Sequence, residues 1–150
     1  MTSSGKIGIA ILSFAHVHAR GYANEVRDHP DCETVAIWDE DPVRGQDEAD
    51  KRGVEFYHEL EDVLALDAVD GVVIDAPTSM HKEIMVAAAK AGKHIFTEKS
   101  LTITLSDATE VLNAVQEAGV KFMISFPSRS RPEILFAKHV IDGEIGRAHV

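Results

Sequence analysis

Short apolar runs alternate with longer amphipathic stretches along the whole 150-residue chain, and this alternation constrains the fold more than any other feature. The apolar runs are rich in β-branched and aromatic residues and end in small or polar ones, which predicts strands. They cover residues 6–12, 34–38, 71–74, 93–96 and 120–125, with a shorter run at 54–57. Continuous apolar strands fit a parallel sheet that is covered on both faces. We therefore predict an α/β fold with a doubly wound parallel sheet of the Rossmann type.

The stretches between the strands carry signals for helix starts and ends. Asp41-Pro42 offers an N-cap followed by proline at the first helical position, and Gly53 suits the helix end. Thr104 and Asp107 resemble a capping box before a helix that ends at Gly119. Further helices are predicted from about residue 14, over 79–91 and over 130–143. The apolar positions predicted to be buried in the last two are Met80, Ile84, Ala87, Ala88 and Ala91, and Ile134, Leu135 and Ile141.

Composition excludes several kinds of partner. The formal net charge of −10 would repel a nucleic-acid backbone, and no apolar run of about 20 residues predicts a membrane span. Cys32 is the single cysteine and cannot form an intrachain disulfide, as is usual in a reducing compartment. We predict a cytoplasmic protein that binds neither nucleic acid nor membrane.

The stretch "IAILSFAHVHARGY" runs from the first strand into a helix, where many α/β proteins bind a phosphate. The positions of a G-x-G-x-x-G loop fall on Ala10, Leu12 and Ala15, so the loop has no glycine. Leucine at the second position should hinder close approach of a phosphate. The N–H groups of residues 13–17 and the Ser13 hydroxyl remain as expected donors. The loop residues predicted to bind a cofactor are Leu12, Ser13, Phe14 and Ala15.

His16-Val17-His18 raises a second possibility, a metal site of a divalent-metal hydrolase. Two histidines at this spacing share a face only in a strand, because in a helix they point about 200° apart. The helical spacing of Ala15, Ala19 and Tyr22 predicts that the pair is split, and the other histidines form no second ligand cluster. The sequence therefore predicts no metal site.

An acidic residue follows the second strand. Asp39 lies 24 residues beyond Ala15, near the spacing expected of a carboxylate that binds the adenosine ribose of NAD. A 2′-phosphate would be repelled there, so NAD is preferred over NADP, and Arg44 is the nearest candidate to accommodate that phosphate. A role for Asp39 as a simple turn residue stays open.

From residue 70 the sequence resembles the N-terminal domain of the glucose-fructose oxidoreductase / inositol dehydrogenase (Gfo/Idh/MocA) family. The resemblance rests on Pro77, Thr78 and His81, on Ala-Gly-Lys-His at residues 91–94, and on Glu98-Lys99-Ser100 in place of Glu-Lys-Pro. His18-Ala19 also fits the family pattern. Ser100 departs from it, so a cis peptide bond here would be one without proline.

The resemblance implies an NAD(P)-dependent oxidoreductase that acts on a sugar, a polyol or a related derivative by hydride transfer. It implies that Lys99 polarises the substrate and that Glu98 orients Lys99, and a lysine ammonium can stabilise developing alkoxide charge. The residues implied to line the nicotinamide side are Ala76, Pro77, Thr78 and His81.

The family also implies a second, α+β substrate domain. We expect a dinucleotide-binding domain over residues 1–146 and the start of that second domain at 147–150. The 150-residue chain alone is then expected to be inactive, and the full-length protein to form a homo-oligomer. A non-catalytic nucleotide-binding or sensing protein, suggested by Leu12 and Ser100, is the alternative.

Overall fold

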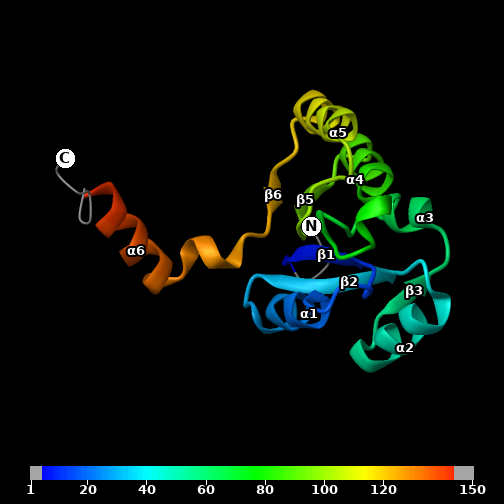
Figure 1. Cartoon of the computed structure of the whole chain (residues 1–150). Coiled ribbons are helices and arrows are strands. Elements are labelled where there is room, and N and C mark those ends of the chain that lie inside the picture. The colour runs from blue at the N-terminus through cyan, green and yellow to red at the C-terminus, as the bar shows by residue number, and fades with distance from the viewer. Residues whose placement is uncertain (1–4, 144–150) are drawn as a thin grey trace, which may run out of the picture.

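The computed structural model describes residues 5–143, which form a six-stranded parallel sheet with helices on both faces (Figure 1). The strands are β1 (Ile7–Leu12), β2 (Cys32–Trp38), β3 (Glu55–Tyr57), β4 (Gly71–Ile74), β5 (His94–Thr97) and β6 (Phe122–Ile124). Their order across the sheet is β3-β2-β1-β4-β5-β6, and every neighbouring pair is parallel. This confirms the predicted doubly wound sheet, with all six apolar runs forming strands.

Helices cover the sheet in two layers. They are α1 (Ala19–Asp28), α2 (Pro42–Arg52), α3 (Leu60–Leu64), α4 (His81–Lys90), α5 (Leu105–Ala118) and α6 (Pro132–Asp142), with 3-10 turns η1 (Thr78–Met80) and η2 (Pro127–Ser130). In Figure 1, α1 and α2 lie on one face and α3, α4 and α5 on the other. The strand order reverses direction between β1 and β4, which makes this position the switch point of the sheet. Open α/β sheets bind ligands at the switch point, beyond the carboxyl ends of the strands.

The predicted helix signals act as expected. The Asp41 side chain accepts hydrogen bonds from the N–H groups of Val43 and Arg44, and Gly53 ends α2 in the left-handed region at φ +67°. Thr104 caps α5 by accepting from the Asp107 N–H. The sequence therefore fixes these ends through local hydrogen bonds.

The prediction that a helix begins near residue 14 is wrong, because α1 begins at Ala19. The N–H groups of the preceding residues are bonded to acceptors outside any helix. Phe14 donates to the Asp39 carboxylate, Ala15 to the Ser13 hydroxyl, and His16 to the Asp75 carbonyl. The segment between β1 and α1 is therefore a loop tied to neighbouring strand ends.

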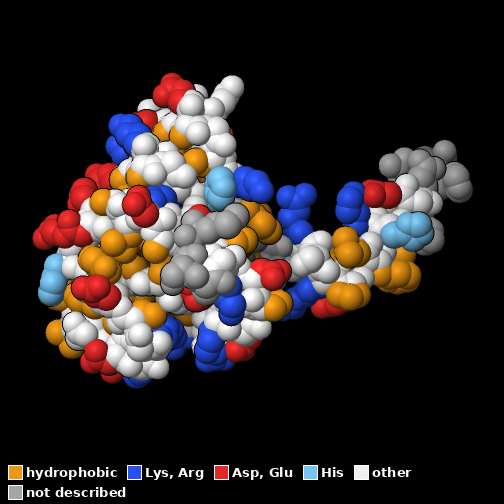
Figure 2. Space-filling view, turned by 180° about the vertical axis from the view of Figure 1, so that it is seen from behind, with side chains coloured by type: hydrophobic (Ala, Val, Ile, Leu, Met, Phe, Trp, Pro, Cys, Tyr) orange, Lys and Arg blue, Asp and Glu red, His pale blue; other side chains and the backbone are white. Residues whose placement is uncertain are grey.

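Two burial predictions also need correction. Ala91 is exposed, whereas Met85 and Ala89, which were not predicted, are fully buried, because α4 lies between the sheet and α5. The apolar residues of α6 are not buried: Leu135 is 52% and Ile141 69% exposed, and α6 stands away from the sheet (Figures 1 and 2). The predicted domain end at 146 and the predicted second-domain start at 147–150 lie outside the described residues.

Candidate active site at the carboxyl edge of the sheet

Five neighbouring strands each end in a polar residue that is almost completely buried. These residues are Ser13, Asp39, Asp75, Glu98 and Ser125, and none is more than 4% exposed. They follow strand residues that pair in register, so they form one row along the carboxyl edge of the sheet. We call this row the polar edge.

Asp39 is held by four hydrogen bonds at the end of β2. Its Oδ2 accepts from the Phe14 N–H at 2.8 Å and from Arg44 Nε at 2.9 Å. Its Oδ1 accepts from the Asp41 N–H at 2.8 Å and from an Arg44 terminal nitrogen at 2.6 Å. A carboxylate has about four acceptor positions, so those of Asp39 are filled. A ribose hydroxyl can bind Asp39 only by displacing one of these donors.

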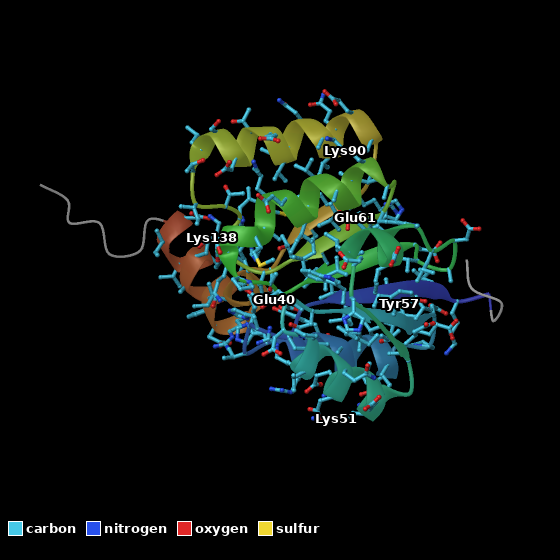
Figure 3. All side chains as sticks on the ribbon, turned by 90° about the vertical axis from the view of Figure 1, so that its right-hand side faces the viewer. Glu40, Lys51, Tyr57, Glu61, Lys90 and Lys138 are labelled. Atoms are coloured by element: carbon cyan, nitrogen blue, oxygen red, sulfur yellow. The ribbon has the colours of Figure 1, made fainter. Side chains whose placement is uncertain are left out.

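Arg44 and its neighbours complete this end of the row. Arg44 also pairs with Glu40 Oε1 at 2.6 Å, whereas Glu40 Oε2 is buried and finds no hydrogen-bond partner among residues 5–143. Figure 3 places Glu40 between the two helical layers, far from Lys51 on α2. A Cβ on Gly45 would lie 2.3 Å from the Phe56 ring and 2.7 Å from Asp39 Cβ. Glycine at this position therefore lets α2 approach closely enough for Arg44 to reach Asp39.

The loop after β1 is shaped without glycine. Ser13 adopts φ +79°, and Leu12 is fully buried in the core on the α4 side. The Ser13 N–H donates to the Trp38 carbonyl, and the N–H groups of Phe14, Ala15 and His16 are bonded as described above. For residues 13–16, the expectation that the backbone N–H groups are free to bind a phosphate is therefore wrong.

Glu98, like Asp39, makes four polar contacts at the polar edge. Its Oε1 accepts from the Tyr22 hydroxyl and lies 2.7 Å from His18 Nδ1. Its Oε2 accepts from the Lys99 N–H at 2.8 Å and lies 3.4 Å from Lys99 Nζ. Burial alone would raise the pKa of Glu98, but the hydrogen bonds from Tyr22, His18 and Lys99 lower this pKa to about 2. Glu98 is thus an anion beside the half-exposed Lys99 ammonium.

Asp75 lies next to Glu98 and was not predicted. The two acids follow Ile74 and Thr97, which are paired in register on β4 and β5. Neither Asp75 oxygen has a hydrogen-bond partner in the described part of the chain, and the residue is fully buried. Burial, and then the charge of Glu98, raise the pKa of Asp75 to about 7. Its signal in the sequence is an acid directly after an apolar strand, the same pattern that identified Asp39.

His81 connects β4 to the loop that follows Lys99. It is 1% exposed, its Nδ1 lies 2.8 Å from the Ser100 carbonyl oxygen, and its Nε2 lies 2.9 Å from the Ala76 carbonyl oxygen. The Lys99–Ser100 peptide bond is cis. Pro77 is exposed and Thr78 half-buried at the same edge. The residues predicted around the nicotinamide therefore lie together, with the His81 ring directed into the protein.

His16 and His18 lie side by side, contrary to the prediction that a helix separates them. Because α1 begins only at Ala19, their ring centroids are 4.8 Å apart and the His18 N–H donates to His16 Nδ1. Burial lowers the pKa of His16, which favours its neutral imidazole. Among the described residues, the third potential ligand near this pair is Glu98 rather than another histidine, with one ligand atom of each of the three residues within 4.8 Å of the other two.

The fold and this edge define a class of protein. A parallel sheet in this order, with an acidic residue after β2 and a loop between β1 and α1 facing the switch point, is the arrangement of dinucleotide-binding Rossmann domains. In residues 5–143, no helix has the length and apolar character that crossing a bilayer requires.

The chain belongs to the oxidoreductase family with an NAD-binding Rossmann fold, GFO_IDH_MocA, whose family model matches residues 7–126. It is 34% identical to the scyllo-inositol 2-dehydrogenase (NAD(+)) of Bacillus subtilis over 94% of this chain and 40% of that protein. It is 33% identical to the inositol 2-dehydrogenase of Salmonella typhimurium over 96% of this chain and 43% of that protein. The chain thus spans about 40% of the length of these curated relatives.

Solved structures agree with this assignment. An NAD-binding oxidoreductase from Klebsiella pneumoniae is 29% identical and superposes with a TM-score of 0.80 over 94% of this chain and 40% of that one. The 3-ketoreductase KijD10 from Actinomadura kijaniata, solved with NADP, is 25% identical with a TM-score of 0.82 over 92% of this chain and 42% of that one. Structural relatives therefore include proteins with either dinucleotide.

Proposed function

We propose that this chain is the cofactor-binding part of an NAD(P)-dependent dehydrogenase that acts on a sugar, a polyol or a related derivative. The observation that carries the proposal is the pair of Glu98 and Lys99 at the end of β5, in a chain of this family. Inositol and other sugar-type substrates belong to the relatives by name, and their extension to this chain is part of the proposal. A cytoplasmic location, a homo-oligomer, and a substrate domain beyond residue 146 belong to the same proposal.

The polar edge fits a dinucleotide in its chemistry. Glu40 Oε2 is a buried acceptor to which no group within residues 5–143 donates, and a ribose hydroxyl is a donor of the kind it lacks. Asp39 and Glu40 would hold the adenosine ribose, the loop of Leu12, Ser13, Phe14 and Ala15 would face the pyrophosphate, and Ala76, Pro77 and Thr78 would face the nicotinamide. When bound, the nicotinamide supplies or accepts the hydride.

Lys99 would bind the reacting oxygen of the substrate. Its side chain is 47% exposed, so the ammonium can reach a ligand at the edge while Glu98 stays buried. The ammonium would stabilise negative charge on that oxygen and hold the proton that the oxygen gains or loses. Glu98 is a positioning residue in this proposal, and His81 positions the same loop through the Ser100 carbonyl.

The proposal is tested by titrating the chain with NADH and following the fluorescence of Trp38, its single tryptophan, which directly precedes Asp39. We expect saturable quenching that weakens in Glu40→Gln and is unchanged in the matched control Glu55→Gln on β3. Absence of binding by both NADH and NADPH at millimolar concentration, with the chain folded, would contradict the proposal.

Arg44 bears on the choice between the two dinucleotides. NAD is the cofactor we propose. Arg44 is the residue we expect to contact the 2′-phosphate if NADPH binds, because its side chain is 28% exposed next to Asp39. Replacing Arg44 by alanine removes a charged donor for a 2′-phosphate and frees two acceptor positions of Asp39. We expect NADPH affinity to fall by about 10- to 100-fold, the equivalent of one charge-assisted hydrogen bond. NADH affinity is expected to stay equal or to rise.

A further inference from the structure

We propose that His16, His18 and Glu98 form a binding site for a zinc ion at the polar edge. One ligand atom from each of the three residues lies within 4.8 Å of the other two. The site uses none of the dinucleotide contacts proposed above, but it shares Glu98 with the proposed Glu98–Lys99 pair: zinc would take Oε1, whereas Lys99 contacts Oε2.

The distances suit a small divalent cation. Zinc bonds of about 2.0–2.1 Å in tetrahedral geometry place two ligand atoms about 3.3 Å apart. His18 Nδ1 and Glu98 Oε1 are now 2.7 Å apart and share a hydrogen bond, and the widest separation in the set is 4.8 Å. A zinc ion would replace the proton between His18 and Glu98 and draw His16 inward.

The ligand types select the metal. Two imidazoles and one carboxylate are a donor set found in zinc sites that keep an open fourth position, whereas magnesium and calcium prefer oxygen ligands only. His16 is partly buried and His18 is exposed, so the ion could enter from solvent without unfolding the sheet. Glu98 is held in place by the Tyr22 hydroxyl and the Lys99 N–H, which act as outer partners of the ligand.

The surrounding charges favour a cation. Glu98 and the neighbouring Asp75 are two buried acids at adjacent strand ends, and the structure gives Asp75 no hydrogen-bond donor within residues 5–143. A divalent cation would offset the cost of keeping these carboxylates next to each other. The opposing charge is the Lys99 ammonium, 3.4 Å from Glu98 Oε2, and its half-exposed side chain can move into solvent.

The test uses the 150-residue chain after treatment with a chelator and dialysis. Isothermal titration with Zn²⁺ is expected to give one equivalent, and Co²⁺ is expected to give the visible absorption of a four-coordinate ion with nitrogen ligands. His18→Ala should weaken Zn²⁺ binding by at least about 100-fold, since loss of even an outer partner costs 10- to 100-fold. The matched control His29→Ala, at the far end of α1, should bind as the unmodified chain does.

His16→Ala gives a second, independent reading, and circular dichroism establishes that each variant is folded. Loss of the tight site in either histidine variant, with the control unchanged, supports the proposal. Failure of the unmodified chain to bind Zn²⁺, or equally tight binding in both His16→Ala and His18→Ala, would overturn it.

Discussion

Replacing Asp39 by asparagine should destabilise the fold by about 3 kcal/mol. Each Asp39 oxygen accepts from one backbone N–H and from the Arg44 guanidinium. An asparagine amide has one oxygen, so its NH₂ group must face two donors whichever way it is turned. One ordinary and one charge-assisted hydrogen bond are lost at a buried position, at about 1 and about 2 kcal/mol respectively.

Urea unfolding followed by Trp38 fluorescence measures this cost, because Trp38 is buried next to Asp39. With a denaturant slope of about 2 kcal/mol per molar urea, the midpoint should fall by about 1.5 M. The matched control is Asp41→Asn, since asparagine caps a helix about as well as aspartate and should leave the midpoint nearly unchanged. A loss below about 0.5 kcal/mol in Asp39→Asn would refute the four-bond description of Asp39, because a single lost charge-assisted bond already exceeds that value.

Three further predictions concern stability. Gly45→Ala should cost about 1–3 kcal/mol in urea unfolding, because the new methyl group would meet the Phe56 ring at 2.3 Å; an unchanged midpoint would mean that the ring moves freely. Glu48→Gln should cost about 3 kcal/mol, since Glu48 is fully buried and bonded to Arg20 and Arg52. Burial would raise the pKa of Glu48, but its arginine partners lower this pKa below the usual 4.5. The Glu48 carboxylate therefore stabilises the fold above pH 4.5, and this stabilisation is lost on acidification. The glutamine variant should lose less stability than the unmodified chain between about pH 5 and pH 3, and an equal loss in the two proteins would contradict this. Thr104→Ala removes the cap of α5 and should cost about 1 kcal/mol by thermal unfolding, whereas a cost near zero would show that water caps the helix equally well.

The sheet could be predicted from the sequence because its signals are local. Each apolar run is short and bounded by polar residues, and caps such as Asp41 and Thr104 act within one turn of the chain. The burial of helix faces was predicted less well, because it depends on neighbours in space. Met85 and Ala89 are buried by the packing of α4 between the sheet and α5, which no periodicity along α4 alone can indicate.

The polar edge was predicted only in part for the same reason. Asp39 was predicted from its spacing after the second strand, whereas Glu98 and Lys99 were predicted only from the resemblance to the family. Asp75 has the same pattern after β4, but only the structure shows that it lies beside Glu98, which follows the neighbouring strand β5. Helical spacing could not predict that His16 and His18 lie side by side. The N–H groups of residues 14–16 donate to Asp39, Ser13 and Asp75, so α1 begins only after these residues.

The loop without glycine has a consequence for cofactor affinity. In a glycine-rich loop the backbone N–H groups are open to the pyrophosphate, whereas here the Phe14 N–H already donates to Asp39 and the Ala15 N–H to the Ser13 hydroxyl. A phosphate oxygen that bound these donors would have to displace a carboxylate and a hydroxyl, each of which would then need a new partner. Asp39 could gain one from a ribose hydroxyl of the same dinucleotide. Pyrophosphate and ribose binding are therefore expected to be coupled through Asp39, so that ADP-ribose should bind far more tightly than pyrophosphate alone.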